Sequence, residues 1–238
     1  MRASAEVAAS AVGACLVAVA TMGLQVYIPA TRGYFNLGET MVYAVALLLG
    51  PRVGFVAGAL GSSMADLLTG YAHYAPATFV IKGVEGFIVG YLSRRLASSR
   101  LSRRLAAAGG LVLSALLLLV GVAFYSGVGE LTLGLPPLRT VTLGVMLSPW
   151  LWVAASAALA AVVGLGLRAD PAVVAAALAA AAGGAEMVLG YFLYEQFVLG
   201  FAAIAEVPFN VGQVLVGVLV AVPLYKSLRA RLESVLSR

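Results

Sequence analysis

Long apolar runs separated by short polar or basic segments are the main pattern of this 238-residue chain. A helix of about 20 apolar residues crosses a hydrocarbon core of about 30 Å, because each residue adds ~1.5 Å. The run at 39–49 is too short to cross alone, so we expect it either to start late or to be sheltered by neighbouring helices. The pattern predicts about eight membrane-spanning helices, over residues 5–28, 39–49, 53–68, 77–96, 105–125, 143–167, 171–199 and 208–228.

Composition supports this interpretation. The chain is 62% hydrophobic and only 11% charged, with a mean hydropathy of +1.02, which lies outside the range of soluble domains. We therefore predict an all-α integral membrane protein with a single transmembrane domain over residues 1–238, in the lipid bilayer of a prokaryotic cell membrane.

The basic residues collect between the apolar runs, as orientation signals do, and not on one nucleic-acid-binding surface. A cytoplasmic N-terminus and an even number of spans leave only Arg32, Arg139 and Lys82 of the 15 basic residues away from the cytoplasm. We therefore predict cytoplasmic N- and C-termini and no nucleic-acid partner.

Ionisable side chains inside the apolar runs are the candidate functional groups. Such a group costs about 2.5–3.5 kcal/mol at membrane depth and usually faces a cavity or the protein interior. Asp66, Lys82 and Glu85 lie among Gly and Ala residues, next to tyrosines that offer hydrogen bonds and flat faces. They predict a pocket for a small solute near the outer face. An internal ion pair of Lys82 with Glu85 or Asp66 is the alternative. Loop residues that could close the pocket are Tyr34, Asn36 and Glu39, although Asn-Leu-Gly-Glu is also a good helix start.

Two stretches have the same order of polar residues, which suggests a parallel repeat of two helical hairpins. Each has an acid, Gly-Tyr four residues later and a Tyr three residues after that. Chance similarity within apolar sequence is the alternative. The first stretch contains Asp66, Gly70, Tyr71 and Tyr74, and the second contains Glu186, Gly190, Tyr191 and Tyr194. The following helices carry Lys82 and Glu85, or Asn210 and Gln213, each pair three residues apart and therefore on one helix face.

Small residues recur every four positions on the first predicted helix, in rows that allow close approach of helices in lipid. The two interpretations are packing within the chain and docking of a partner protein. The rows include Ala5, Ala9 and Gly13, and also Ala14 and Ala18.

Patterns for catalysis and metal binding are absent from the sequence. It contains no G-x-x-x-x-G-K-[ST] phosphate loop, no H-E-x-x-H pair and no serine elbow. His73 is the single histidine, so it favours a loop or lid contact over a metal ligand, and Cys15 is expected to be buried and inert. We therefore expect no catalytic residue, metal or cofactor.

Three stretches together resemble the substrate-binding S components of energy-coupling factor (ECF) vitamin transporters, and most closely those of the riboflavin type. They are FNLGETMVYAVALLLGPRVGFVAGALGSSMADLL, APATFVIKGVEGFIVGYLSRR and GYFLYEQFVLGFAAIAEVPFNVGQVLVGVLVAVPLYKSL. The resemblance implies a six-helix bundle with an outward-facing pocket for a vitamin, with riboflavin as a candidate. It also implies docking of a T component on the first helix and energy from two separate ATPase subunits. By position, it implicates Asn36, Glu39, Asp66, Lys82, Glu85, Glu195, Asn210 and Gln213 in or near the pocket.

Residues 103–167 depart from the family pattern. We interpret them as an inserted transmembrane hairpin between two parts of an S-component-like core, 1–100 and 168–238. Two other functions stay open at this point. One is a self-sufficient secondary transporter in which Asp66 or Glu186 relays protons. The other is a membrane enzyme that uses Glu85 or His73.

Overall fold

The computed structural model describes residues 3–28, 33–97, 101–124, 126–135, 139–166 and 170–236. The helices are α1 (Ala3–Gly23), α2 (Gly38–Leu49), α3 (Pro51–Thr69), α4 (Ala75–Leu96), α5 (Leu101–Phe124), α6 (Pro149–Gly166), α7 (Pro171–Leu199), the 3-10 helix η1 (Gly200–Ala205) and α8 (Val207–Leu236). The strands are β1 (Gln25–Ile28), β2 (Gly33–Asn36), β3 (Gly127–Leu135) and β4 (Arg139–Leu147).

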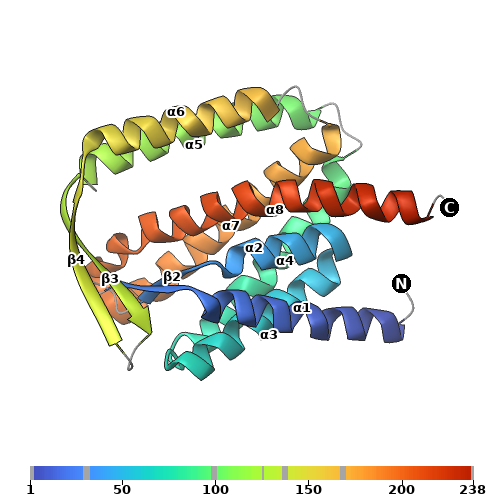
Figure 1. Ribbon diagram of the computed structural model, residues 1–238, viewed down its shortest axis with the longest axis horizontal. Coiled ribbons are helices and arrows are strands. Elements are labelled where there is room, and N and C mark those ends of the chain that lie inside the picture. Colours follow the sequence, from blue (N-terminus) through green and yellow to red (C-terminus); the bar gives the residue numbers. More distant parts are fainter. Residues whose placement is uncertain are drawn as a thin grey trace.

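The helices form a bundle with a helical pair along one side. Figure 1 shows α5 and α6 running together above the remaining helices, and α5 contacts α7. The start of α1 and the end of α8 lie at one end of the bundle, and the strands lie at the other. Both ends of the chain therefore lie on the same side, as an even number of crossings requires. Their cytoplasmic location stays a prediction.

Helix α2 is the centre of the bundle. It packs against α1, α3, α4 and α8, and its residues from Val42 to Leu47 are all buried. The prediction that neighbouring helices shelter this short helix is confirmed. Gly50 then turns the chain with φ 95°, a conformation that favours glycine, and Pro51 begins α3.

Helices α3 and α4 touch through glycines. A Cβ atom added to Gly86 would lie 2.3 Å from the carbonyl oxygen of Gly54, and one added to Gly58 would lie 2.3 Å from the carbonyl oxygen of Lys82. Close backbone contact through small residues is typical of helix packing in lipid, where burial of apolar surface gives little drive for association. This contact holds Lys82 against the middle of α3.

The described helices support insertion into a membrane. Four of them are long and apolar enough to cross one, over Ala3–Gly23, Ala75–Leu96, Pro171–Val198 and Val207–Arg231. Large apolar side chains such as Val7, Val19 and Phe197 are exposed on them, as expected for surfaces in contact with lipid. The protein is a helical membrane protein, whereas the count of eight spans stays a prediction.

A small antiparallel sheet accompanies the helices of a fold that is otherwise consistent with the all-α expectation. Its strand order is β2-β1-β3-β4, and β1 pairs with both β2 and β3. The segments GVGELTLGL and RTVTLGVML are rich in Val, Thr and Leu, and they pair along their full length as β3 and β4. Pairing satisfies backbone groups that an irregular linker would leave open.

The sheet also changes two predicted spans. The run at 5–28 is divided between α1, which ends at Gly23, and β1. The run at 143–167 begins as the second half of β4, and α6 starts only at Pro149, because proline suits the first turn of a helix and not its interior. Apolar content alone did not distinguish a strand from a helix here. Cys15 is exposed on α1, so its predicted burial is wrong.

Candidate functional site

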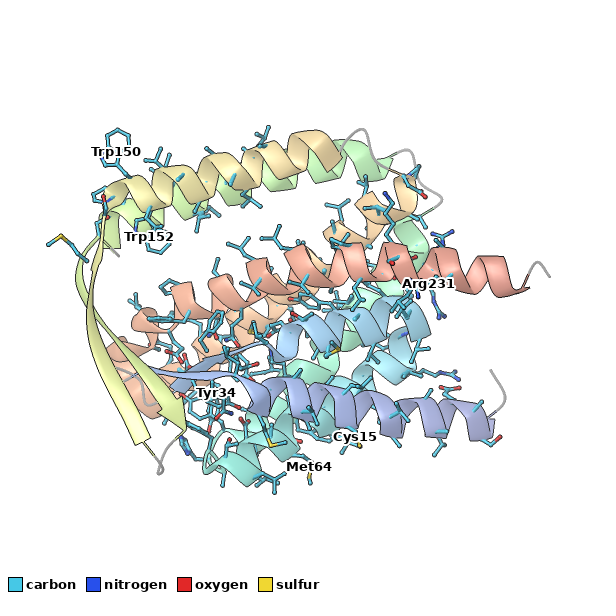
Figure 2. The ribbon with its side chains drawn as sticks, in the orientation of Figure 1. Cys15, Tyr34, Met64, Trp150, Trp152 and Arg231 are labelled. Atoms are coloured by element: carbon cyan, nitrogen blue, oxygen red, sulfur yellow. The ribbon has the colours of Figure 1, made fainter. Side chains whose placement is uncertain are left out.

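A polar pocket lies between the helices near β2 and has about 490 Å³ of empty space, part of which is open to the outside. Side chains from α1, β2, α3, α4, α7 and α8 reach it, together with residues that flank α4 and α8. Figure 2 shows Tyr34 toward the sheet end of the bundle and Arg231 toward the opposite end. The lining residues are Thr21, Tyr34, Asn36, Gly38, Ser62, Asp66, Tyr74, Thr78, Lys82, Tyr191, Glu195, Glu206, Asn210 and Gln213.

A buried ion cluster lies behind Lys82. The Lys82 ammonium donates to Oε1 of Glu39 and to Oε2 of Glu85, the second contact at 3.2 Å. The hydroxyl of Tyr43 donates to Oε1 of Glu85 at 2.9 Å. All four side chains are buried, and one ammonium group faces two carboxylates. Lys82 Nζ also lies 5.6 Å from the ring centroid of Tyr191, a distance typical of a cation–π contact.

Tyrosines connect α4 to α7 along one wall of the pocket. The Tyr74 hydroxyl donates to Oε1 of Glu195 at 3.3 Å, and the Tyr191 hydroxyl donates to Oγ1 of Thr78 at 3.0 Å. Burial and the Glu195 carboxylate raise the pKa of Tyr74 above its usual value. Tyr74 therefore remains a hydrogen-bond donor at physiological pH.

Strand β2 brings a third tyrosine to the pocket. The Tyr34 hydroxyl donates to Oδ1 of Asp66 at 2.6 Å, and its ring lies on Tyr71 with centroids 4.4 Å apart. Burial and the Asp66 carboxylate raise the pKa of Tyr34. The strand is thereby tied to α3 by a charge-assisted hydrogen bond, which is stronger than a neutral one.

An amide relay ties β2 to α8. The backbone N–H of Asn36 donates to Oε1 of Gln213 at 3.1 Å, and Nε2 of Gln213 donates to Oδ1 of Asn210 at 3.0 Å. The side chain of Asn36 accepts from the N–H of Gly38 at 2.7 Å, at the start of α2. Residues far apart in the chain are thus held at one side of the pocket.

The structure places the twelve predicted solute-binding residues in two groups. Eight line the pocket: Asn36, Asp66, Tyr74, Lys82, Tyr191, Glu195, Asn210 and Gln213. The other four do not line it. Glu39 and Glu85 lie in the ion cluster, Tyr71 supports the ring of Tyr34, and the Tyr194 hydroxyl donates to the His73 carbonyl at 2.5 Å. The structure therefore contains the internal ion pair of Lys82 with Glu85 that the sequence left as an alternative, and Lys82 lines the pocket as well.

Five lining residues were not predicted from the sequence. Thr21, Gly38, Ser62 and Thr78 are small residues within or at the start of helices, where no local pattern sets them apart from packing residues. Glu206 follows η1 and carries the one signal that sequence reasoning could have used, a carboxylate between apolar segments.

The two acids of the suggested repeat occupy different places. Asp66 lines the pocket. Glu186 is half-buried, does not line it, and interacts electrostatically with Glu85 and Lys82. The tyrosines also differ, because Tyr71 supports Tyr34 whereas Tyr191 lines the pocket. The shared spacing does not produce equivalent positions.

One small residue of the rows on α1 packs against other helices of the same chain. A Cβ atom added to Gly13 would lie 3.0 Å from both Ala57 and Val45, so Gly13 faces the bundle interior. This contact supports packing within the chain, and not docking of a partner, at the Gly13 end of its row. Docking of a partner through Ala5, which is exposed, and through the half-buried Ala9, Ala14 and Ala18 stays a prediction.

Comparison with known proteins places this arrangement in a family. A protein of Pyrococcus woesei, described as an uncharacterized protein in gap 3'region, is 50% identical over 78 residues. That match covers 33% of this chain and 52% of the relative, so it spans about half of the relative's length. The sequence model described as "ECF-type riboflavin transporter, S component" matches residues 2–133, which include α1 to α5. This match covers more than half of the chain, and the chain therefore belongs to the ECF-type riboflavin transporter S component family.

Proposed function

We propose that this chain is the substrate-capture subunit of an ECF-type importer in a prokaryotic cell membrane. It binds a vitamin or vitamin-like small molecule from the outside, and a separate T component with two ATPase subunits drives uptake. Riboflavin, which the family description names, is the first solute to test. The family is one of transport subunits and not of enzymes.

The observation that carries the proposal is the convergence of polar side chains from distant parts of the chain on one pocket. Asn36, Lys82, Glu195 and Asn210 come from four different elements. A small number of placed polar groups beside aromatic rings is typical of small-molecule sites. In a chain that is 62% hydrophobic, so many buried polar groups carry a stability cost that solute binding offsets.

The first experiment tests capture. The protein is purified in detergent, and mass spectrometry identifies any small molecule that it retains. We expect a retained solute in the wild type and its loss in Asn210→Ala, because that change removes a lining amide. Gln196→Ala is the matched control, since Gln196 is exposed on α7 and does not line the pocket. Equal retention by Asn210→Ala and the wild type would remove Asn210 from the site.

The second experiment tests energy coupling. Vesicles that contain the chain with a T component and both ATPase subunits should take up the solute only when ATP is present. Vesicles with the chain alone should bind it without accumulating it. Accumulation by the chain alone, driven by a pH gradient, would contradict the proposal and support the proton-coupled alternative through Asp66 or Glu186.

A further inference from the structure

Two carboxylates in the pocket have no cationic partner among the described residues. Glu195 is 1% exposed and Asp66 is 3% exposed. Each uses one oxygen, since Oε1 of Glu195 accepts from Tyr74 and Oδ1 of Asp66 accepts from Tyr34. Oε2 of Glu195 and Oδ2 of Asp66 are buried and have no hydrogen-bond partner in the described parts of the chain.

Lys82 does not pair with either acid. Its ammonium is already engaged by Glu39 and Glu85, which do not line the pocket. Ion pairs among the described residues do not include either Glu195 or Asp66. The lining contains the acids Asp66, Glu195 and Glu206 and one base, Lys82, so acidic side chains outnumber basic ones there.

Aromatic rings surround the same space. Tyr34, Tyr74 and Tyr191 all line the pocket. The face of a tyrosine ring attracts cations within about 6 Å of its centroid. Rings and carboxylates together form the combination that recognises a positively charged, flat group.

We infer that the pocket selects a solute with a positively charged, planar nitrogen heterocycle, whose cationic edge meets Glu195 and Asp66. This inference rests on the proposed function, because it assumes that the pocket captures a solute. An unpaired buried carboxylate is costly, and a bound cation would supply the missing partner. A neutral ring without donors would leave both free oxygens unpaired.

A pair of probes that differ by one N-methyl group and the positive charge it confers tests the inference. Binding of 1-methylnicotinamide, a cation, and of nicotinamide, its neutral counterpart, is measured by calorimetry on the full-length purified protein, with riboflavin as a neutral ring of another size. Mass spectrometry of the retained solute gives an independent record of its charge. The variants are Glu195→Gln and Asp66→Asn, and Glu6→Gln is the control because Glu6 lies on α1 beside Arg52, outside the pocket.

We expect the cationic probe to bind at least tenfold more tightly than its neutral counterpart, and Glu195→Gln and Asp66→Asn to lose this preference. Glu6→Gln should keep it. Without solute, Glu195→Gln should melt at or above the wild-type temperature, because the change removes a buried acid that has no cationic partner among the described residues. This readout separates loss of binding from loss of folding.

Three results would overturn the inference. The first is equal or tighter binding of the neutral probe, and the second is an unchanged preference in both carboxylate variants. The third is a retained solute that carries no cationic nitrogen. In each of these cases solute capture itself would stand. Absence of any retained solute and of binding by every probe would instead contradict the proposed function, and the inference with it.

Discussion

The Tyr34 hydroxyl lies 2.6 Å from Oδ1 of Asp66, so a residue of strand β2 is bound to a carboxylate of α3 at the pocket. The two residues are 32 positions apart in the chain. The contact closes one side of the pocket with the chain that follows α1, because Tyr34 precedes α2 by only a few residues.

We expect Tyr34→Phe to weaken solute binding about tenfold. A hydrogen bond to a charged group contributes about 1.5–3 kcal/mol, and about 1.4 kcal/mol corresponds to a tenfold change in affinity. Calorimetry with the retained solute measures the change. Tyr91→Phe is the control, since Tyr91 is 41% exposed on α4 and stacks on Phe87 away from the pocket. Equal affinity of Tyr34→Phe and wild type would exclude a role for this bond in binding.

Lys82→Met should strongly destabilise the protein, because it leaves the Glu39 and Glu85 carboxylates buried without their cation. Breaking such a pair costs about 3–5 kcal/mol, which thermal unfolding in detergent should report as a lowered melting temperature. Replacing Glu39 and Glu85 by Gln in the same chain should restore much of the loss. Arg52→Met, in the 4.0 Å pair with Glu6 where Arg52 is 83% exposed, should change stability by about 0–1 kcal/mol. A wild-type melting temperature for Lys82→Met would contradict the cluster.

Gln213→Leu should lower solute affinity more than it lowers stability. The change removes the acceptor for the N–H of Asn36 and the donor to Asn210, so both residues lose their fixed positions beside the pocket. Each lost hydrogen bond is worth about 0.5–1.5 kcal/mol. Binding and melting are measured on the same samples, with Gln196→Leu as the exposed counterpart. A fall in melting temperature with unchanged affinity would show that the relay only supports the fold.

Gly86→Ala should destabilise the bundle, although alanine normally favours a helix over glycine by about 0.5–1 kcal/mol. The added Cβ would lie 2.3 Å from the carbonyl oxygen of Gly54, and backbone cannot move aside cheaply. Gly109→Ala on α5 meets no atom within 4 Å, so it should leave the melting temperature unchanged or raise it. If both variants melt alike, α3 and α4 are not in close contact.

The sequence could predict the pocket only in part. Asp66 and Lys82 stood out because ionisable groups are rare in apolar helices, and Glu195 was implicated by the family resemblance. The structure places all three in the lining of the pocket. Thr21, Ser62 and Thr78 carried no such signal, since a hydroxyl in a membrane helix can bond its own backbone. Thr21 does so, donating to the carbonyl of Val17 at 2.8 Å.

By itself, the sequence determined the helical membrane character of the protein, the bounds of α7 and the buried state of α2, because long apolar runs can satisfy their backbone only as helices in lipid. Tertiary structure alone decided that β3 and β4 form strands, because they pair with each other and with β1 from a distant part of the chain. It also decided that Asp66 enters the pocket while Glu186 does not. Equal spacing along a helix sets which residues share a face, but only packing against other helices decides what that face meets.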